Sequence, residues 1–326
     1  MKIGIVISGG DVSGINNFIF QVARLAGAQI TLFNGGIPGL LEKNHREVSW
    51  SDLVDFSISS IPIITSGRTA RNLQRSEYET IARKIKSLRI DVLIMAGGDG
   101  SLQFLNTLSE FDINCFGVGM TIDNDVYGSD YTIGFSTACE QIIKEVSRLR
   151  NTGRALPGRV FMAEILGGYC GELTLQSAIK SNADIALIPE AQIPLETLAE
   201  RVKQKLASQN SVVILCSEGY TREYSPGFQG AIDTMIKQLE PRIGVRIRKT
   251  IIGYGLRNGD PTCEEIYQGT IMANEVVRCI QSGMKNKAVI INSSNKPIPI
   301  DLVSMKKRLV DTDGHYYKLA KQLNII

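Results

Sequence analysis

Two carboxylates and a hydroxyl lie within one short segment, Thr121-Ile122-Asp123-Asn124-Asp125. In an extended chain the side chains alternate, so Thr121, Asp123 and Asp125 would turn to one side. One carboxylate could then accept the proton of an attacking hydroxyl while another helps to hold a metal ion, as phosphoryl transfer requires. An Asx-rich turn that satisfies its own backbone has the same composition. The spacing therefore leaves a catalytic and a structural interpretation open.

A glycine turn ends the first apolar run of the chain. Ser8-Gly9-Gly10-Asp11 closes the run 2–8, and a helical pattern begins near Gly14. Glycines leave backbone N–H groups accessible, and the N-terminus of a helix attracts anions, so this turn is suited to a phosphate group. The alternative is a tight strand-to-helix turn without a ligand.

A second glycine turn repeats this arrangement. Gly97-Gly98-Asp99-Gly100-Ser101 follows the apolar run 92–96 and precedes another helical pattern. Ligands of α/β sheets bind beyond the carboxyl ends of the strands, so both turns could face one phosphate chain. Asp99 would then lie where carboxylate and phosphate oxygens hold a magnesium ion. Neither turn has the spacing of the Walker motif or of the dinucleotide-binding motif.

The elements that must position these clusters alternate between strands and helices. Short β-branched runs predict strands at 2–8, 29–33, 90–96, 115–119, 160–166, 185–188, 212–216, 250–253 and 288–291. Helical patterns predict helices at about 14–26, 74–88, 136–150, 194–208, 227–239 and 263–282. Such alternation is typical of βαβ units, so we expect an α/β fold with mainly parallel sheets.

Composition argues against several classes of protein. The chain has 326 residues and 43% hydrophobic content, enough for a sizeable core and most simply for two domains. Its net charge of +3 is evenly spread, so we expect no nucleic-acid partner. The sequence has neither a membrane-length apolar window nor a signal peptide, which predicts a cytoplasmic protein without membrane contact. The 2 histidines and 6 scattered cysteines argue against histidine acid–base chemistry and against a zinc site.

Together, the three clusters resemble the phosphofructokinase family. The match is closest in TIDNDVYGSDYTIGFSTA (121–138). KIGIVISGGDVSGIN (2–16) is similar to the family's N-terminal signature and AGGDGS (96–101) to its nucleotide-phosphate loop. The run that begins with RVFMAEILGGYCGELTLQ at 159 is similar to the start of its substrate domain.

The resemblance implies a phosphofructokinase-like fold of two similar three-layer α/β domains with mainly parallel sheets. The nucleotide-binding domain would comprise 1–138 plus 251–300, and the sugar-phosphate-binding domain 139–250 plus 301–326. It also implies a homo-oligomer, a tetramer or a dimer, in which neighbouring subunits complete the sugar-phosphate pocket.

The resemblance assigns a role to each cluster. Asp123 corresponds to the general base for the acceptor hydroxyl, with Thr121 and Asp125 beside it. Asp99 corresponds to the residue that acts on magnesium, and Arg68 to the arginine that stabilises the transferring phosphoryl group. The phosphate-cradle positions are Gly9, Gly98, Gly100 and Ser101.

Further matches lie on the acceptor side. Three arginines correspond to those that hold the substrate's existing phosphate: Arg159, Arg248 and Arg257. Glu218 corresponds to the carboxylate that contacts sugar hydroxyls, and Leu166 and Gly167 belong to the same pocket. Guanidinium groups suit phosphate by geometry and charge, so we expect an acceptor that is already phosphorylated. Gly168 replaces the usual arginine, and Tyr254 stands where a phosphate-binding histidine is common.

The resemblance implies an ATP-dependent 6-phosphofructokinase of glycolysis, which moves the γ-phosphoryl group to the 1-hydroxyl of fructose 6-phosphate with Mg²⁺. Members that use pyrophosphate typically carry Asp at the position of Gly100 and Lys at that of Met120, so ATP is the expected co-substrate. The departures at Gly168 and Tyr254 leave a kinase of another ketose or cyclitol phosphate as an alternative. A non-catalytic nucleotide or sugar-phosphate sensor on the same fold is a further alternative.

Overall fold

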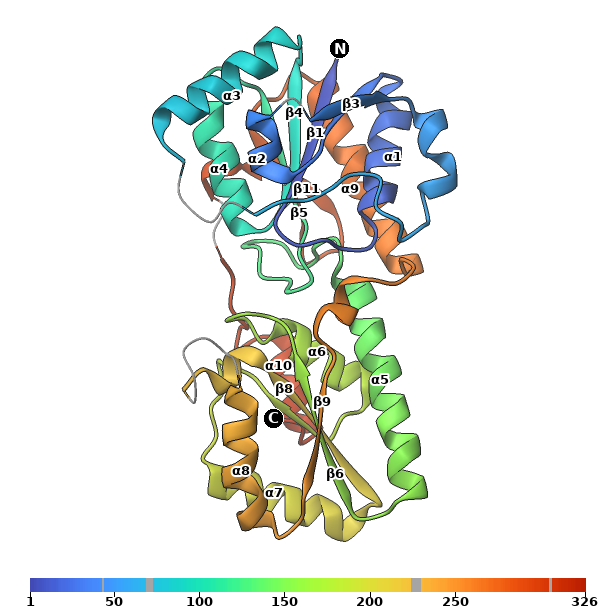
Figure 1. Ribbon diagram of the computed structural model, residues 1–326, viewed down its shortest axis with the longest axis vertical. Helices are drawn as coiled ribbons and strands as arrows, with labels where there is room; N and C mark the ends of the chain where they lie inside the picture. Colours follow the sequence, from blue (N-terminus) through green and yellow to red (C-terminus); the bar gives the residue numbers. More distant parts are fainter. Residues whose placement is uncertain (43, 69–72, 224–229, 305–306) are drawn as a thin grey trace. The chain divides into compact units, whose positions relative to one another are not determined.

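The computed structural model describes residues 1–42, 44–68, 73–223, 230–304 and 307–326. It divides into two compact units, each assembled from two stretches of the chain (Figure 1). Unit 1 comprises Met1–Thr137 and Arg257–Arg308, and unit 2 comprises Ala138–Leu256 and Leu309–Ile326. The boundaries expected from the sequence differ from these units at 138, at 251–256 and at 301–308.

Unit 1 is built on a seven-stranded sheet with the strand order β11-β10-β5-β4-β1-β2-β3. The strands are β1 (Ile3–Ser8), β2 (Ile30–Phe33), β3 (His45–Val48), β4 (Val92–Gly97), β5 (Cys115–Gly119), β10 (Lys287–Ile291) and β11 (Pro297–Asp301). The inner strands run parallel, whereas β3 and β11 pair antiparallel at the two edges. Every residue of β1 and β4 is buried, as expected for central strands that are covered on both faces.

Helices cover both faces of this sheet (Figure 1). On one face, α1 (Ile15–Ala26) and α9 (Cys263–Gln281) pack against each other. On the other lie α2 (Gly36–Leu41), α3 (Arg75–Ser87) and α4 (Asp99–Ser109). In α3, Ile81 and Ile85 lie one turn apart and are buried, while charged neighbours face the solvent. This single apolar stripe is what directs the helix onto the sheet.

Unit 2 has a four-stranded parallel sheet with the order β7-β8-β6-β9. Its strands are β6 (Arg159–Ile165), β7 (Ile185–Leu187), β8 (Ser211–Ser217) and β9 (Ile247–Ile251). The helices around it are α5 (Phe135–Ala155), α6 (Glu172–Ser181), α7 (Leu195–Ser208), α8 (Ala231–Ile243) and α10 (His315–Gln322) (Figure 1). Short 3-10 helices occur in both units: η1 (Trp50–Phe56) and η4 (Leu302–Ser304) in unit 1, η2 (Glu218–Glu223) in unit 2, and η3 (Gly253–Arg257) where the chain passes from unit 2 to unit 1. On one face, Val160 and Ile214 of the sheet pack with Leu198 of α7 and Leu239 of α8.

The predicted α/β class with mainly parallel sheets is confirmed. β5 has the predicted bounds, whereas β9 begins at Ile247 instead of 250. The edge strands β3 and β11 were missed because their sequences, HREV and PIPID, leave most side chains at least partly exposed and form no apolar run. The short helices α2 and α6 were also missed. Of the predicted helix 227–239, residues 227–229 lie outside the described residues, and α8 begins at Ala231.

In the part of the chain that the structure describes, no helix is both long and apolar enough to cross a membrane. Five cysteines are buried as free thiols, and Cys263, at the start of α9, is exposed.

Candidate active site

The three clusters meet in unit 1 at one cavity of about 680 Å³. They follow β1, β4 and β5, which are neighbours in the sheet and end at the same edge because they run parallel. The lining residues are Ser8, Gly9, Gly10, Ile37, Arg68, Leu73, Tyr78, Gly98, Asp99, Gly100, Ser101, Gln103, Phe104, Thr107, Met120, Thr121, Asp123, Asp125, Arg257 and Lys307.

The turn after β1 requires glycine at position 9 and lies against an arginine side chain at position 10. Gly9 has a φ of 106°, which residues with a side chain rarely adopt, and its N–H donates to the carbonyl of Gly67 at 3.2 Å. A Cβ on Gly10 would collide with the guanidinium group of Arg257. Arg257 therefore lies directly against this turn, which brings a predicted substrate-binding arginine to the phosphate cradle.

The turn after β4 lies beside the first one, because the strand register pairs Ser8 with Gly97. Oγ of Ser101 donates to the carbonyl of Ser8 at 3.3 Å and ties the two turns together. A Cβ on Gly98 or Gly100 would have no heavy atom within 4 Å, so both glycines leave open space. α4 begins here, and the first N–H groups of a helix lack partners within it. The turn is therefore suited to bind an anion.

The segment after β5 is a turn and not an extended strand. The N–H of Asp123 donates to Oγ1 of Thr121 at 3.1 Å, and Nδ2 of Asn124 donates to the carbonyl of Asp130 at 3.1 Å. Asn124 itself has a φ of 52°. Thr121, Asp123 and Asp125 nevertheless all line the cavity. The geometry thus accommodates both interpretations of this cluster, since polar atoms support the turn while its carboxylates face the cavity.

An ion pair at this turn was not anticipated from the sequence. Nζ of Lys307 lies 3.1 Å from Oδ2 of Asp125, whose side chain is only 6% exposed. Burial raises the pKa of Asp125 above its ordinary value, although Lys307 opposes this. Burial lowers the pKa of Lys307, but the attraction of Asp125, Asp99 and Asp123 outweighs this and raises it. No motif contains Lys307, so sequence patterns provided no signal for it.

One end of the cavity is apolar. Ile37 and Leu73 line it together with Tyr78 and Phe104, whose rings stack with their centroids 5.2 Å apart. Burial raises the pKa of the Tyr78 hydroxyl. The cavity therefore has an apolar, aromatic part of its lining as well as phosphate-binding turns, and Tyr78 and Phe104 were not identified from the sequence.

Asp99 could hold a metal ion only together with other ligands. Within the described ranges, no group of three or more His, Cys, Asp or Glu residues is arranged to bind a metal ion. Mg²⁺ is commonly held by one or two carboxylates plus substrate phosphates. Asp99 lies in the first turn of α4, beside the open space at Gly98 and Gly100. The residues present therefore fit a magnesium ion that arrives with a phosphate chain.

In unit 2, Leu166, Gly167 and Glu218 come together because Ile165 pairs with Ser217 at the ends of β6 and β8. Oε1 of Glu218 accepts from the N–H of Gly167 at 3.1 Å and from the N–H of Gly168 at 2.8 Å. Gly168 has a φ of 57°. The absence of the usual arginine at 168 therefore coincides with a left-handed backbone, in which a side chain would be strained.

Three other residues predicted to bind the acceptor lie apart from Gly167 and Glu218. Arg159 is the first residue of β6, and Arg248 of β9 pairs with Phe161. Both therefore lie in the amino-terminal half of the strands, away from the carboxyl ends that carry Gly167 and Glu218. Tyr254 lies in η3 and is 83% exposed. Unit 2 by itself does not gather the predicted acceptor residues at one place.

Comparisons with known proteins identify the family of the chain. The family model described as "Phosphofructokinase" matches residues 2–280. The chain belongs to the phosphofructokinase family. It is 32% identical to an ATP-dependent 6-phosphofructokinase from Vibrio cholerae, over 99% of this chain and 99% of the relative. It is 31% identical to another from Clostridioides difficile, again over 99% of each chain. A pyrophosphate–fructose 6-phosphate 1-phosphotransferase from Dictyoglomus thermophilum is 27% identical over 98% of each chain.

Solved phosphofructokinases share the fold. The enzyme from Pichia pastoris matches with a TM-score of 0.83 and 25% identity over 93% of this chain. That protein is much longer, and the match covers 35% of it. A pyrophosphate-dependent phosphofructokinase from Nitrosospira multiformis matches with a TM-score of 0.83 and 17% identity, over 99% of this chain and 90% of that one. The phosphofructokinase-like fold expected from the sequence is thereby confirmed.

Proposed function

We propose that this chain is an ATP-dependent 6-phosphofructokinase, which transfers the γ-phosphoryl group of ATP to the 1-hydroxyl of fructose 6-phosphate with Mg²⁺. The observation that carries the proposal is the cavity of unit 1, where two glycine turns, carboxylates and arginines converge. Phosphoryl transfer requires these parts, because it depends on positioning and on stabilisation of charge. Membership in the phosphofructokinase family supports the same activity.

Asp123 is the proposed general base. Its carboxylate would accept the proton of the acceptor hydroxyl as the oxygen attacks the γ-phosphorus and the bond to the ADP oxygen breaks. The hydrogen bond from its N–H to Thr121 supports an orienting role for Thr121. Asp125 would assist from the same turn.

The donor phosphates would lie on the two glycine turns. Backbone N–H groups at Gly9, Gly98 and Gly100 would bind phosphate oxygens, and Ser101 would hold the two turns in register. Asp99 would hold Mg²⁺, which neutralises phosphate charge when bound. Arg68 would stabilise the charge on the transferring group, because its side chain lines the same cavity.

The apolar end of the cavity favours ATP over pyrophosphate as donor. A nucleobase is a largely apolar group that can pack against apolar and aromatic side chains, whereas pyrophosphate has no apolar part. Tyr78, Phe104, Ile37 and Leu73 supply such a surface. The open space at Gly100 leaves room for the remainder of a nucleotide. We therefore assign unit 1 to the nucleotide.

The predicted acceptor residues of unit 2 would bind the sugar phosphate, and Arg257 would bind phosphate in the cavity of unit 1. Glu218 would contact sugar hydroxyls near Leu166 and Gly167, and Tyr254 would lie at the edge of the pocket. Arg159 and Arg248 would hold the substrate's phosphate in a neighbouring subunit. Their position supports this. Arg159 and Arg248 lie in the amino-terminal halves of their strands and Glu218 follows a carboxyl end, so side chains from the two edges of the sheet cannot contact one small ligand.

A homo-oligomer is part of this proposal. Exposed apolar side chains cluster between residues 50 and 61, on and after η1 in unit 1: Trp50, Val54, Phe56, Ile58 and Ile61. Groups of exposed apolar side chains are typical of protein–protein contacts. We also propose the cytoplasm as its location, where ATP and sugar phosphates are available.

A kinase of another ketose or cyclitol phosphate is the second candidate. Gly168 has the left-handed backbone described above, and Tyr254 is largely exposed where the family commonly has a histidine. Both changes affect the acceptor and leave the donor cavity intact.

The proposal is tested by incubating the purified protein with Mg²⁺ and either ATP or pyrophosphate across a panel of sugar phosphates. We expect ATP-dependent phosphorylation of fructose 6-phosphate. Asp123→Asn should lower kcat by about 10²- to 10⁴-fold while ATP still binds, because the general base is lost. Asp112→Asn is the matched control. Asp112 is an exposed residue that pairs with Lys86, so this variant should leave kcat unchanged.

Each alternative has its own outcome. Turnover of a different sugar phosphate in preference to fructose 6-phosphate would support the second candidate. Binding of ATP without transfer to any acceptor would indicate a sensor. Full activity of Asp123→Asn would show that Asp123 is not the base.

A further inference from the structure

The charged groups of the cavity balance one another. Among the described lining residues there are three acids and three bases: Asp99, Asp123, Asp125, Arg68, Arg257 and Lys307. The arginines have proposed roles on phosphate, whereas Lys307 has none so far. A cation beside these carboxylates alters how a phosphate chain approaches them. It also alters the affinity of the carboxylates for metal ions.

Lys307 contacts the most buried of these acids. Its ammonium lies 3.1 Å from Oδ2 of Asp125, and the exposed fractions of the two side chains are 36% and 6%. A buried carboxylate without a nearby cation is costly, and it repels phosphate oxygens in the same cavity. Asp99 and Asp123 also act electrostatically on Lys307. The lysine is therefore placed to compensate the whole acidic group.

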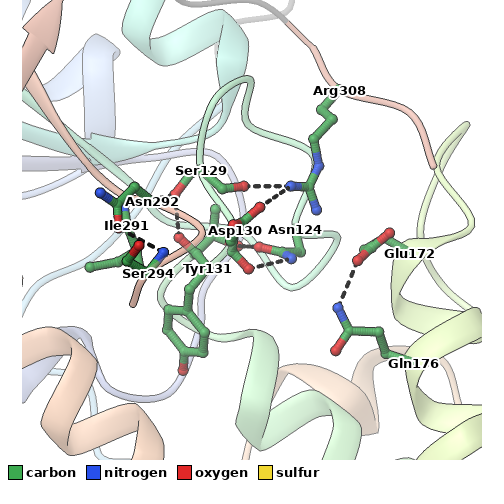
Figure 2. A network of polar contacts seen from close by, with 11 residues as sticks. Asn124, Ser129, Asp130, Tyr131, Glu172, Gln176, Ile291, Asn292, Ser294 and Arg308 are labelled. Carbon is green, nitrogen blue, oxygen red and sulfur yellow. Dashed lines mark hydrogen bonds and ion pairs between the residues drawn. The ribbon is translucent and has the colours of Figure 1, made fainter. Parts of the chain in front are cut away.

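The backbone around Lys307 is attached to the segment that carries two of these acids, Asp123 and Asp125. The N–H of Arg308 donates to the carbonyl of Asp125 at 2.6 Å, and Lys307 forms an antiparallel bridge with Val126. Figure 2 shows the guanidinium group of Arg308 directed at Ser129 and Asp130 of the same segment. Nη1 lies 2.7 Å from the Ser129 carbonyl and 3.2 Å from Oδ1 of Asp130. Lys307 is thus held at Asp125 by main-chain contacts as well as by its charge.

We infer that Lys307 is a positioning residue for phosphoryl transfer, which keeps Asp125 in the cavity and offsets the negative charge of the three acids. This inference rests on the proposed function. Without Lys307, the charged lining would be three acids against two arginines, so the donor phosphates would meet an excess of negative charge. The rate of transfer would fall, because charge stabilisation is a main source of catalysis in such sites.

An ordinary surface ion pair provides the matched control. Lys287 and Asp301 form a pair at 2.5 Å in the same unit, and Lys287 is 30% exposed. Asp301, however, is 65% exposed, and neither residue lines the cavity. Exposed pairs of this kind contribute little to stability. Lys287→Met therefore removes a lysine of similar exposure without changing the site.

The test compares Lys307→Met, Lys307→Gln and Lys307→Arg with Lys287→Met. We expect the Met and Gln variants to lower kcat by about 10- to 100-fold, with a smaller change in KM for ATP, and Arg to retain most of the rate. Lys287→Met should match the wild type. A second readout is independent of turnover: in the presence of saturating ADP, Mn²⁺ titrated by electron paramagnetic resonance should bind Lys307→Met about 3- to 10-fold more tightly than the wild type, because a nearby positive charge is gone.

The outcomes separate this inference from the proposed function. A wild type that phosphorylates no acceptor would overturn the proposed function, and the Mn²⁺ comparison would then decide the role of Lys307. If Lys307→Met matched Lys287→Met in either kcat or Mn²⁺ affinity, the inference would be wrong. It would also be wrong if the Met and Gln variants both lost their folded structure in urea titrations while Arg kept it, because Lys307 would then be structural.

Discussion

The two units differ in how they gather functional residues. In unit 1, the predicted residues follow the carboxyl ends of β1, β4 and β5, and one cavity collects them. In unit 2, Glu218 follows a strand whereas Arg159 begins one, so the predicted residues lie at different places. A motif directly after a parallel strand is positioned by the sheet alone. A residue at the start of a strand lies at the opposite edge of the sheet, so we expect it to act on another surface.

The largest effect expected from this comparison is at Arg248. It tests whether Arg248 acts on a substrate that is bound to a second copy of the chain. Arg248→Ala should lower kcat/KM for fructose 6-phosphate by about 10²-fold, because a phosphate contact is lost. When the Arg248→Ala and Asp123→Asn proteins are mixed and reassembled, the mixture should regain part of the activity that each variant has lost. Hybrid sites would then combine Asp123 of one chain with Arg248 of the other.

The control for this mixture comes from unit 1. Arg257 and Asp123 line the same cavity of one unit, so Arg257→Ala mixed with Asp123→Asn should regain no activity. Recovery is measured as the steady-state rate of the reassembled proteins. Recovery in both mixtures, or in neither, would contradict the assignment of Arg248 to a neighbouring chain and of Arg257 to the same cavity as Asp123.

A smaller effect is expected for Gly100→Asp in the donor cavity. The position has open space, and an acid in the first turn of α4 is favourable for the helix, so stability should be retained. The carboxylate would occupy space beside the donor phosphates and repel them. We expect kcat/KM for ATP to fall by about 10- to 100-fold.

Gly100→Asn has nearly the same size without the charge and should lose less activity. Equal losses would indicate that space alone matters. Rates with ATP and with pyrophosphate, measured side by side, would show whether the change affects the nucleotide selectively.

The smallest effect concerns stability and compares buried acids in the two units. In unit 1, Glu265 of α9 is fully buried and accepts from the N–H of Gly134 at 2.6 Å and from Oγ1 of Thr137 at 3.0 Å. Burial raises its pKa to about 7, against the opposing effect of these hydrogen bonds. The folded state therefore binds more protons than the unfolded state below that pH, and its free energy of unfolding decreases as pH rises toward it.

Glu265→Gln removes this dependence. Relative to the variant, the wild type should lose roughly 1–3 kcal/mol of unfolding free energy between about pH 5 and 8, as measured by urea titration. In unit 2, burial also raises the pKa of Glu164, with Glu218 adding to the effect, but this side chain is only half-buried. Glu164→Gln should therefore have the weaker pH dependence. The opposite order would contradict the burial argument.

Much of the fold was predictable because its central strands are apolar throughout. VLIMAG in β4 is buried on both faces, and such a run has few alternatives in an α/β chain. The edge strands β3 and β11 were not predictable, because their pairing depends on a neighbouring strand and not on their own pattern. The same reason explains the displaced start of β9, where Arg248 and Lys249 interrupt the apolar run.

The residues of the proposed donor side could be found from sequence patterns. Glycine turns and carboxylates that directly follow strands are local features, and parallel pairing brings them to one edge whatever the rest of the chain does. The tertiary structure alone decided that Lys307 contacts Asp125, that Arg257 lies on Gly10, and that Tyr78 stacks on Phe104. These contacts join distant segments or side chains without a motif, so only the folded chain determines which of them meet.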